Sequence, residues 1–191
     1  MVSMHMHTRA QSGVSLVEVL VAMVILAIGL LGLVGLQGRL HVLQMESYQR
    51  AQALVLLHDM ASRVMLNRSN ADDYVTASPL GAGADCALIV GATRAIEDSR
   101  DWCNAIQGAA ETIGADDTRV GAMLGGRGCV ESIGSGEYLV TVAWQGLGPV
   151  SAPPDSVACG VGEYGEDGSI CEGDVCRRVV TTVVRIANLT G

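Results

Sequence analysis

Residues 14–36 read VSLVEVLVAMVILAIGLLGLVGL, and this stretch decides the fold of the chain. Its only charged side chain is that of Glu18. An α-helix rises about 1.5 Å per residue, so the stretch would form a helix about 35 Å long, which is enough to cross the hydrocarbon core of a bilayer. We therefore predict a transmembrane helix over residues 14–36.

A cleaved secretory signal is the main alternative interpretation of this stretch. Such signals have an apolar region of about 7–15 residues that ends in an Ala-x-Ala-like site. The stretch here is longer, and the residues at 36–39, LQGR, match such a site poorly. We expect it to remain in the mature protein. Arg9 precedes it, but Arg39 and Arg50 follow it, so the positive charges indicate its orientation only weakly.

A helical pattern continues beyond the apolar stretch, over residues 37–68. Mostly apolar side chains recur there at steps of three or four, with polar side chains on the opposite side. No proline interrupts residues 14–67, so we predict one helix about 80 Å long that stops at NRSN, residues 67–70. The predicted buried stripe is Leu40, Leu43, Ser47, Ala51, Leu54, Leu57, Ala61 and Val64, and the opposite side holds Gln49, Gln52, Asp59 and Arg63.

The remaining residues, 69–191, have the pattern of an α+β domain. Strands are expected at 129–133 and 137–144, joined by the glycine-containing turn GSG, and at 178–186. The third strand would turn Val180, Val184 and Ile186 to one face. Residues 146–174 are rich in glycine and acidic residues and are expected to be a long loop. A short helix is expected to be capped by Asp98 or Ser99 and to carry Trp102, Ile106, Ala110 and Ile113 on one face.

This domain is acidic. Residues 69–191 contain 17 acidic and 7 basic side chains, which is an excess of ten negative charges. A domain of this charge repels phosphate backbones and has no basic stripe, so we expect no nucleic-acid binding.

All six cysteines follow the apolar stretch. An even number in the part expected outside the cytosol indicates disulfide bonds formed in an oxidising compartment, with buried free thiols as the alternative. The cysteines also favour an extracytoplasmic location for the C-terminal part. Their spacing does not fix the pairing, and we expect Cys86–Cys103 after the long helix, Cys159–Cys171 within the acidic loop, and Cys129–Cys176 between the hairpin and the last strand.

The sequence indicates no group of catalytic or metal-binding residues in this domain. The four histidines, His5, His7, His41 and His58, all precede the domain, so it lacks the base of a hydrolase and a histidine ligand for zinc. Cys171 and Cys176 lack a matching second pair. The acidic residues of the loop do not have the spacing of a standard calcium loop, and we expect them to be solvated. We expect neither cofactor nor enzymatic activity. The loop residues concerned are Glu163, Glu166, Asp167, Glu172 and Asp174.

The sequence GVSLVE at residues 13–18 resembles the processing signature of type IV prepilins. In that family a leader ending in glycine is cleaved before the apolar stretch, the new first residue is N-methylated, and a glutamate is the fifth residue. The resemblance implies a leader over residues 1–13, cleavage between Gly13 and Val14, methylation of Val14, and a role in assembly for Glu18. Many members have phenylalanine where this chain has Val14.

Glu18 also has a physical interpretation. An ionised acid in the middle of a bilayer costs about 2.5–3.5 kcal/mol on insertion scales, so a nearby cation is needed to justify it. Cleavage after Gly13 would create an α-ammonium group at Val14, one helical turn away. Glu18 would then pair with its own terminus or with that of a neighbouring subunit, and the resemblance implies the neighbour. The alternative is a glutamate tolerated in water near the interface.

Residues 18–35, EVLVAMVILAIGLLGLVG, are similar to the anchor of the PilV-type minor pilins. This resemblance implies a type IV pilin fold, in which a long N-terminal α-helix packs on a small antiparallel β-sheet with disulfide-bonded loops. Many pilins have proline at the position of Gly35. Glycines recur here at every third residue and would permit either local unwinding or close contact between helices, or would simply weaken the helix. They are Gly29, Gly32, Gly35 and Gly38.

The resemblance implies a structural protein of the pilus. It would be processed by a prepilin peptidase, held in the inner membrane with a periplasmic C-terminal domain, and moved by an inner-membrane assembly platform into the fibre. Its partners would be other minor pilins, the major pilin and a large tip adhesin, in a tip complex that primes assembly. A minor pseudopilin of type II secretion is one alternative, and a single-span periplasmic protein that binds a ligand or performs thiol chemistry is another.

Overall fold

The computed structural model describes residues 13, 15–109, 112–113, 118–119, 121 and 123–187. The chain divides into two compact units, residues 1–43 and residues 44–191. Helix α1 (Leu16–Leu66) is continuous and ends one residue before the NRSN stop that the sequence predicts.

After α1 come the 3-10 helix η1 (Arg68–Tyr74) and the strand β1 (Leu80–Gly81), then η2 (Cys86–Leu88) and the helix α2 (Arg94–Ile106). The hairpin strands β4 (Arg127–Gly134) and β5 (Glu137–Gln145) and the last strand β6 (Arg177–Arg185) confirm the three predicted strands. The sequence did not indicate three short strands, which are β1, β2 (Thr112–Ile113) and β3 (Thr118–Arg119). The 3-10 helix η3 (Glu172–Asp174) lies at the end of the predicted loop.

The main sheet is antiparallel, with the order β1-β4-β5-β6. The β4–β5 turn uses Gly136 at φ +71°, where a Cβ would lie 2.7 Å from the carbonyl oxygen of Ile186. The ladder between β5 and β6 sets Tyr138 opposite Val184 and Val142 opposite Val180. Val184 is buried, and Val180 and Ile186 pack against the core, so the face predicted for the third strand is confirmed.

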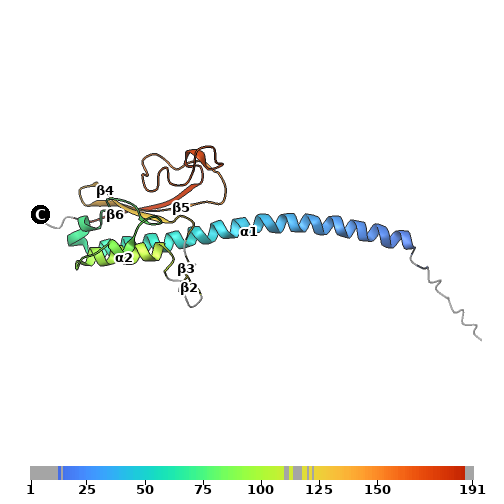
Figure 1. Cartoon of the computed structure of the whole chain (residues 1–191), viewed down its shortest axis with the longest axis horizontal. Helices are drawn as coiled ribbons and strands as arrows, with labels where there is room; N and C mark the ends of the chain where they lie inside the picture. Colours follow the sequence, from blue (N-terminus) through green and yellow to red (C-terminus); the bar gives the residue numbers. More distant parts are fainter. Residues whose placement is uncertain are drawn as a thin grey trace, which may run out of the picture. The chain divides into compact units, whose positions relative to one another are not determined.

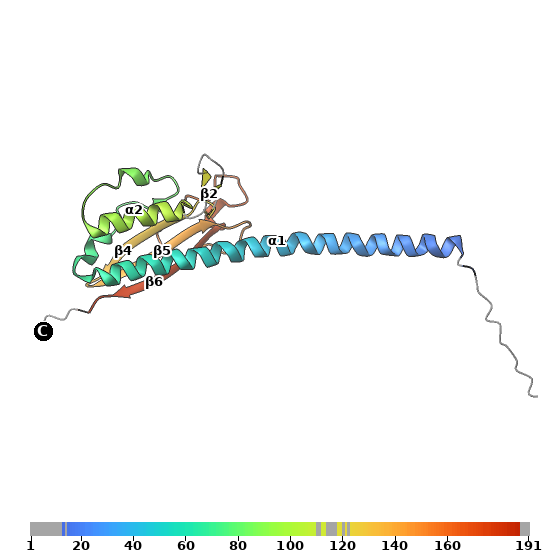
Figure 2. The same ribbon diagram turned by 90° about the horizontal axis from the view of Figure 1, so that it is seen from below.

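Residues 44–191 form three layers. The C-terminal part of α1 and α2 lie side by side on one face of the sheet, and the loop between β5 and β6 lies over the other face (Figures 1 and 2). We call these the helix face and the outer face. The helix face carries the main core, in which Trp102, Val130, Val140 and Val142 are each no more than 1% exposed. The architecture is therefore the predicted α+β fold, a long helix packed on a small antiparallel sheet.

The buried stripe of α1 differs from the predicted one. Only Leu57, Ala61 and Val64 of the predicted stripe are buried, whereas Leu54 is 38% exposed and Gln49, predicted on the polar side, is 6% exposed. Apolar side chains occur on several sides of this segment, so periodicity alone does not select the face that meets the sheet. The buried residues are Gln49, Ala53, Leu56, Leu57, Met60, Ala61 and Val64.

Helix α2 begins earlier than predicted, so the cap at Asp98 or Ser99 was wrong. Thr93 is the N-cap, and its Oγ1 accepts a hydrogen bond from the amide of Ile96. Trp102 and Ile106 are buried as expected, but α2 ends at Ile106 and Ile113 belongs to β2. Ala110 lies outside the described residues.

Asp98 is buried inside α2 and joins three elements. Its carboxylate accepts hydrogen bonds from the Tyr74 hydroxyl at 2.6 Å, from Nη1 of Arg63 at 2.7 Å, and from Nε of Arg94 at 3.2 Å. Burial alone would raise the pKa of Asp98. The hydrogen bonds from Tyr74, Arg63 and Arg94 outweigh this effect, so the pKa of Asp98 is lowered from its ordinary value.

A second carboxylate contact holds η1 to the sheet. The hydroxyl of Tyr138, on β5, donates to Oδ1 of Asp72 at 2.6 Å. This hydrogen bond and burial together raise the pKa of Tyr138 to about 12. The neutral phenol is therefore the form that the fold stabilises.

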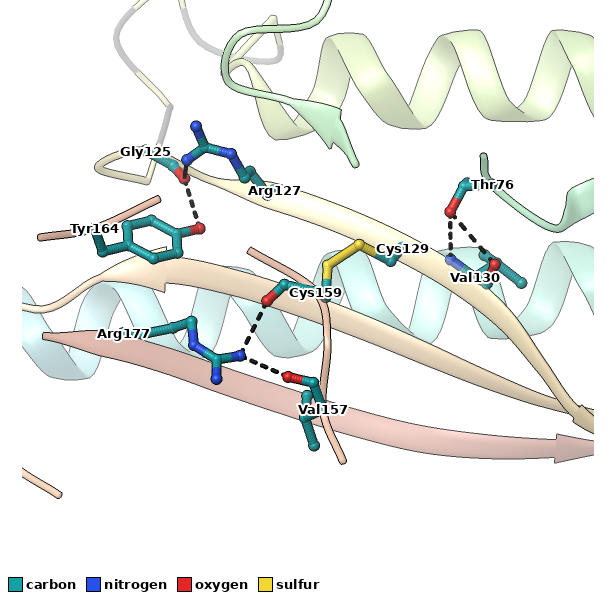
Figure 3. The surroundings of a disulfide bond; sticks show 9 residues. All are labelled: Thr76, Gly125, Arg127, Cys129, Val130, Val157, Cys159, Tyr164 and Arg177. Carbon is teal, nitrogen blue, oxygen red and sulfur yellow. Dashed lines mark hydrogen bonds between the residues drawn. A yellow bond between two sulfur atoms is a disulfide. The ribbon is translucent and has the colours of Figure 1, made fainter. Parts of the chain in front are cut away.

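Three disulfide bonds form, and two predicted pairings were wrong. Cys86–Cys103 is bonded as predicted, whereas the other bonds are Cys129–Cys159 and Cys171–Cys176 instead of Cys159–Cys171 and Cys129–Cys176. Cys129 points from β4 to the outer face, where the loop brings Cys159 over it (Figure 3). Cys171 and Cys176 are only five residues apart, and the turn at η3 brings them together.

The loop over the outer face is fixed by polar contacts as well as by the disulfides (Figure 3). Arg177 is 2% exposed, and its Nη1 donates to the carbonyl oxygens of Val157 at 2.7 Å and Cys159 at 3.2 Å. The hydroxyl of Tyr164 donates to the carbonyl of Gly125 at 2.9 Å. The predicted loop is therefore an ordered layer.

We predict that Asp98→Asn destabilises the protein by about 2 kcal/mol, because it removes the buried carboxylate that accepts hydrogen bonds from Tyr74, Arg63 and Arg94. The loss is smaller than for a fully broken buried pair, since Arg63 keeps its ion pair with Asp59 at 2.9 Å and 25% of its side chain exposed. Urea unfolding of the full chain in detergent measures this. Because the pKa of Asp98 is lower in the folded protein than in the unfolded chain, the ionised carboxylate stabilises the fold at pH values above the unfolded pKa. This stabilisation is lost as the pH falls through the pKa of the folded state. The variant should lack this acid-dependent loss.

Asp101→Asn is the matched control, because Asp101 is 62% exposed and lies 4.0 Å from the same guanidinium. It should change the free energy of unfolding by less than about 0.5 kcal/mol. Equal losses for the two variants would contradict the role given to Asp98.

We also predict that the two disulfides of the outer face contribute unequally. The Cys129–Cys159 bond spans 30 residues and the Cys171–Cys176 bond spans 5. The chain-entropy model gives about 3.6 kcal/mol for the first and about 2.1 kcal/mol for the second. Replacing both cysteines of each pair by alanine and comparing urea unfolding measures the difference, and a larger loss for the shorter loop would show that another effect dominates.

Candidate assembly site at the amino-terminal helix

The N-terminus of α1 lies directly after the predicted cleavage point. The carbonyl oxygen of Ser15 accepts hydrogen bonds from the amides of Glu18 at 3.0 Å and Val19 at 3.3 Å, which starts the helix. Gly13 is exposed, and Val14 lies outside the described residues. The predicted cleavage between them and the methylation of Val14 stay predictions.

Glu18 is exposed in the first turn of α1. A carboxylate at this position interacts favourably with the positive end of the helix dipole, by about 0.3–1 kcal/mol. No ion pair joins Glu18 to another residue in the part of the chain that the structure describes. Residues 1–13 precede Val14 here, so its nitrogen is a peptide amide, and the predicted amine partner exists only after cleavage.

The surface of α1 after Glu18 is apolar on all sides. Over residues 19–36 every large hydrophobic side chain is between 45% and 73% exposed. Among the described residues, α1 is the one helix long and apolar enough to cross a membrane. An exposed apolar surface this large indicates contact with lipid or with other proteins.

Nothing in the described part of the chain explains the glycines of this segment. A Cβ added at Gly29, Gly32, Gly35 or Gly38 would meet no atom within 4 Å. Each costs a helix about 1 kcal/mol relative to alanine. Any advantage of glycine must therefore come from the surroundings of the helix, and the alternatives given by the sequence remain open.

The sequence patterns did not indicate one anchoring residue of the helix, Glu46. Oε1 of Glu46 accepts a hydrogen bond from the amide of Leu147 at 3.0 Å and lies 3.3 Å from Nη2 of Arg178. The same nitrogen donates to the carbonyl of Gly148 at 2.8 Å. Glu46 is 132 residues from Arg178, and no local pattern marks such a pair.

Three of the five acidic residues of the loop have separate partners. Glu163 pairs with Arg127 at 2.6 Å, Oδ1 of Asp174 accepts from the amide of Gly162 at 3.0 Å, and Glu172 accepts from another loop amide. Within the described ranges no three histidine, cysteine or carboxylate side chains are grouped to hold a metal ion. His41 and His58 are exposed on α1.

Residues 8–34 match the family model of the prokaryotic N-terminal methylation motif. The match includes the Gly13–Val14 junction, Glu18 and most of the apolar stretch. No curated protein and no solved structure matches the chain.

The methylation motif is a type IV prepilin-like signal, and the fold that follows it, a long apolar helix packed on a four-stranded antiparallel sheet with disulfides, fits an α+β pilin fold. The motif and the fold together support a type IV pilin-like or pseudopilin protein, anchored in a membrane by its amino-terminal helix.

Proposed function

We propose that this protein is a minor pilin of the type IV pilus, of the PilV type. A prepilin peptidase removes residues 1–13 and the new terminus at Val14 is methylated. Before assembly the chain is held in the inner membrane with residues 69–191 in the periplasm. It then enters the fibre through contacts of α1 with neighbouring helices.

The observation that carries this proposal is the placement of Glu18 in the methylation motif. It is the single charge in an apolar stretch that is otherwise suited to lipid, and it lies four residues after the predicted new amine. A carboxylate in lipid needs a cationic partner, and a neighbouring subunit's terminus would supply one only when the two chains are in the correct register. The pair would then fix the axial position of each subunit.

The remaining roles extend the same proposal. The chain joins other minor pilins and the major pilin in a small tip complex, with a large adhesin as a further partner, and primes assembly rather than catalysing a reaction. All six cysteines are in disulfide bonds, so the thiol-active alternative would require one of these bonds to open first.

A minor pseudopilin of type II secretion is the second candidate, because the matched motif supports both groups. Co-purification distinguishes them. A minor pilin should be recovered with sheared surface fibres, and a pseudopilin with the secretion apparatus.

We predict that the protein extracted from its native membrane lacks residues 1–13 and carries one added methyl group. Intact-mass measurement tests this directly, and the same chain expressed in a host without a prepilin peptidase is the control, which should keep its leader. A native mass that still includes residues 1–13 would overturn both the pilin and the pseudopilin proposals.

We further predict that Glu18→Gln lowers incorporation into fibres by about tenfold or more, because the variant keeps the shape of the side chain but loses the charge that pairs with the amine. Cleavage and membrane insertion should persist, since glutamine is less costly in lipid than an ionised acid. Immunoblots of sheared fibres and of membranes measure the two quantities. Val19→Ala is the matched control on the next residue and should leave incorporation within about twofold. Normal incorporation of Glu18→Gln would remove the basis of the proposal.

A further inference from the structure

Strand β6 forms one edge of the main sheet, and it is long and regular. The other edge is β1, which has only 2 residues, whereas β6 has 9. The ladder with β5 runs without a bulge from Arg177, opposite Gln145, to Arg185, opposite Glu137. An edge strand of this kind presents unpaired N–H and C=O groups to a further strand.

Two hydrogen bonds at the ends of the ladder show which backbone groups of β6 face β5. The amide of Gly146 donates to the carbonyl of Cys176 at 2.8 Å, and the amide of Ile186 donates to the carbonyl of Gly136 at 2.8 Å. Successive residues of a strand turn their backbone groups to opposite sides. The even-numbered residues between Cys176 and Ile186 therefore bond to β5, and the odd-numbered residues face away from it.

A third hydrogen bond confirms this direction. The amide of Val150 donates to the carbonyl of Val175 at 2.8 Å. The loop after β5 therefore covers the side of the chain that faces away from β5, just before β6 begins. Beyond that point no described residue forms a backbone hydrogen bond on this side. The residues left with free N–H and C=O groups are Val179, Thr181, Val183 and Arg185.

The usual protections of an edge are absent from the centre of β6. Residues 179–184 read VVTTVV, with no proline, glycine or charged side chain, and no bulge bends them away. Thr181 and Val183 are exposed. Figure 2 shows the C-terminal half of β6 extending past α1, so the helix does not cover this part of the edge.

The side chains beside the free edge define what would pair there. Val183 is opposite Leu139 on β5, which makes an apolar row across the outer face. Arg185 is opposite Glu137, whose Oε1 lies 2.7 Å from its Nε, and the Arg185 side chain still remains 76% exposed at the end of the strand, so that its guanidinium can contact a further carboxylate. A partner strand gains most if it places an apolar side chain next to Val183 and an acidic side chain next to Arg185.

A second copy of this chain fits the edge poorly. Two such domains would each bring an excess of ten negative charges. Antiparallel pairing about a twofold axis at Thr181 would also set Arg185 of one copy opposite Arg177 of the other. Like charges directly opposite each other destabilise a strand pair.

We propose that the free edge of β6 binds an extended segment of a different polypeptide chain as a fifth strand of the sheet. That segment is uncharged and β-branched where it pairs with residues 179–184, and it carries an acidic residue opposite Arg185. Backbone hydrogen bonds to Val179, Thr181 and Val183 supply the affinity, and the side chains supply the register. The proposal depends on residues 44–191 alone, so it stands or fails independently of leader cleavage.

The test uses the full chain in detergent and a synthetic peptide of the length of β6, which alternates valine and threonine between terminal glutamates. Fluorescence anisotropy should show binding that Thr181→Pro weakens by about tenfold or more, because proline removes the amide facing the free edge. The ladder to β5 does not use that amide, so the fold should persist. Thr181→Ser keeps the amide and is the matched control, which should bind as the wild type does. A peptide with terminal arginines should bind more weakly.

Hydrogen exchange of the wild-type protein gives a second measurement that needs no variant. The amides of Thr181 and Val183 should exchange rapidly in the free protein and slowly with the glutamate peptide. Absence of peptide binding, equal binding by Thr181→Pro in a folded protein, or equal binding of the arginine peptide would each overturn the proposal as stated. Self-association of the wild type that Thr181→Pro abolishes would overturn it in favour of a second copy.

Discussion

Trp102 is the contact on which the packing of residues 44–191 depends. Its ring is fully buried between the two helices and β4, and its Nε1 donates to the carbonyl of Leu56 in α1 at 2.9 Å. Gly128 of β4 leaves room for it, since a Cβ there would lie 2.6 Å from Cζ3 of the indole and would have to displace it. One side chain of α2 therefore positions both α1 and the sheet. A fully buried tryptophan also contributes a large apolar area to this core.

The elements with a strong local pattern were predictable from the sequence. Each of these patterns involves only residues that are close in sequence: the apolar stretch, the NRSN stop and the hairpin turn at 134–136. The structure has α1, β4, β5 and β6 where the sequence patterns place them. The fold class followed from their order. The motif match at residues 8–34 agrees with the processing signature GVSLVE at residues 13–18.

Features that depend on distant residues were not predictable. The face of α1 that is buried depends on its contacts with Trp102 and the sheet. For that reason Leu54, which was expected to be buried, is exposed, and Gln49, which was expected to be exposed, is buried. Asp98 resembles a helix cap in sequence, yet its partners Arg63 and Tyr74 lie on other elements. The disulfide pairing depends on the path of the loop over the outer face, which glycine-rich and acidic composition does not determine. The amine partner predicted for Glu18 would exist only after cleavage, so no single uncleaved chain contains it.

The positions of the disulfides have a mechanical consequence. All three join residues that follow α1, namely Cys86–Cys103, Cys129–Cys159 and Cys171–Cys176. Tension applied along α1 would therefore reach the sheet through the peptide link after Leu66 and through non-covalent contacts such as Arg63–Asp98 and Glu46–Arg178. The covalent loops would resist extension while those contacts yield first.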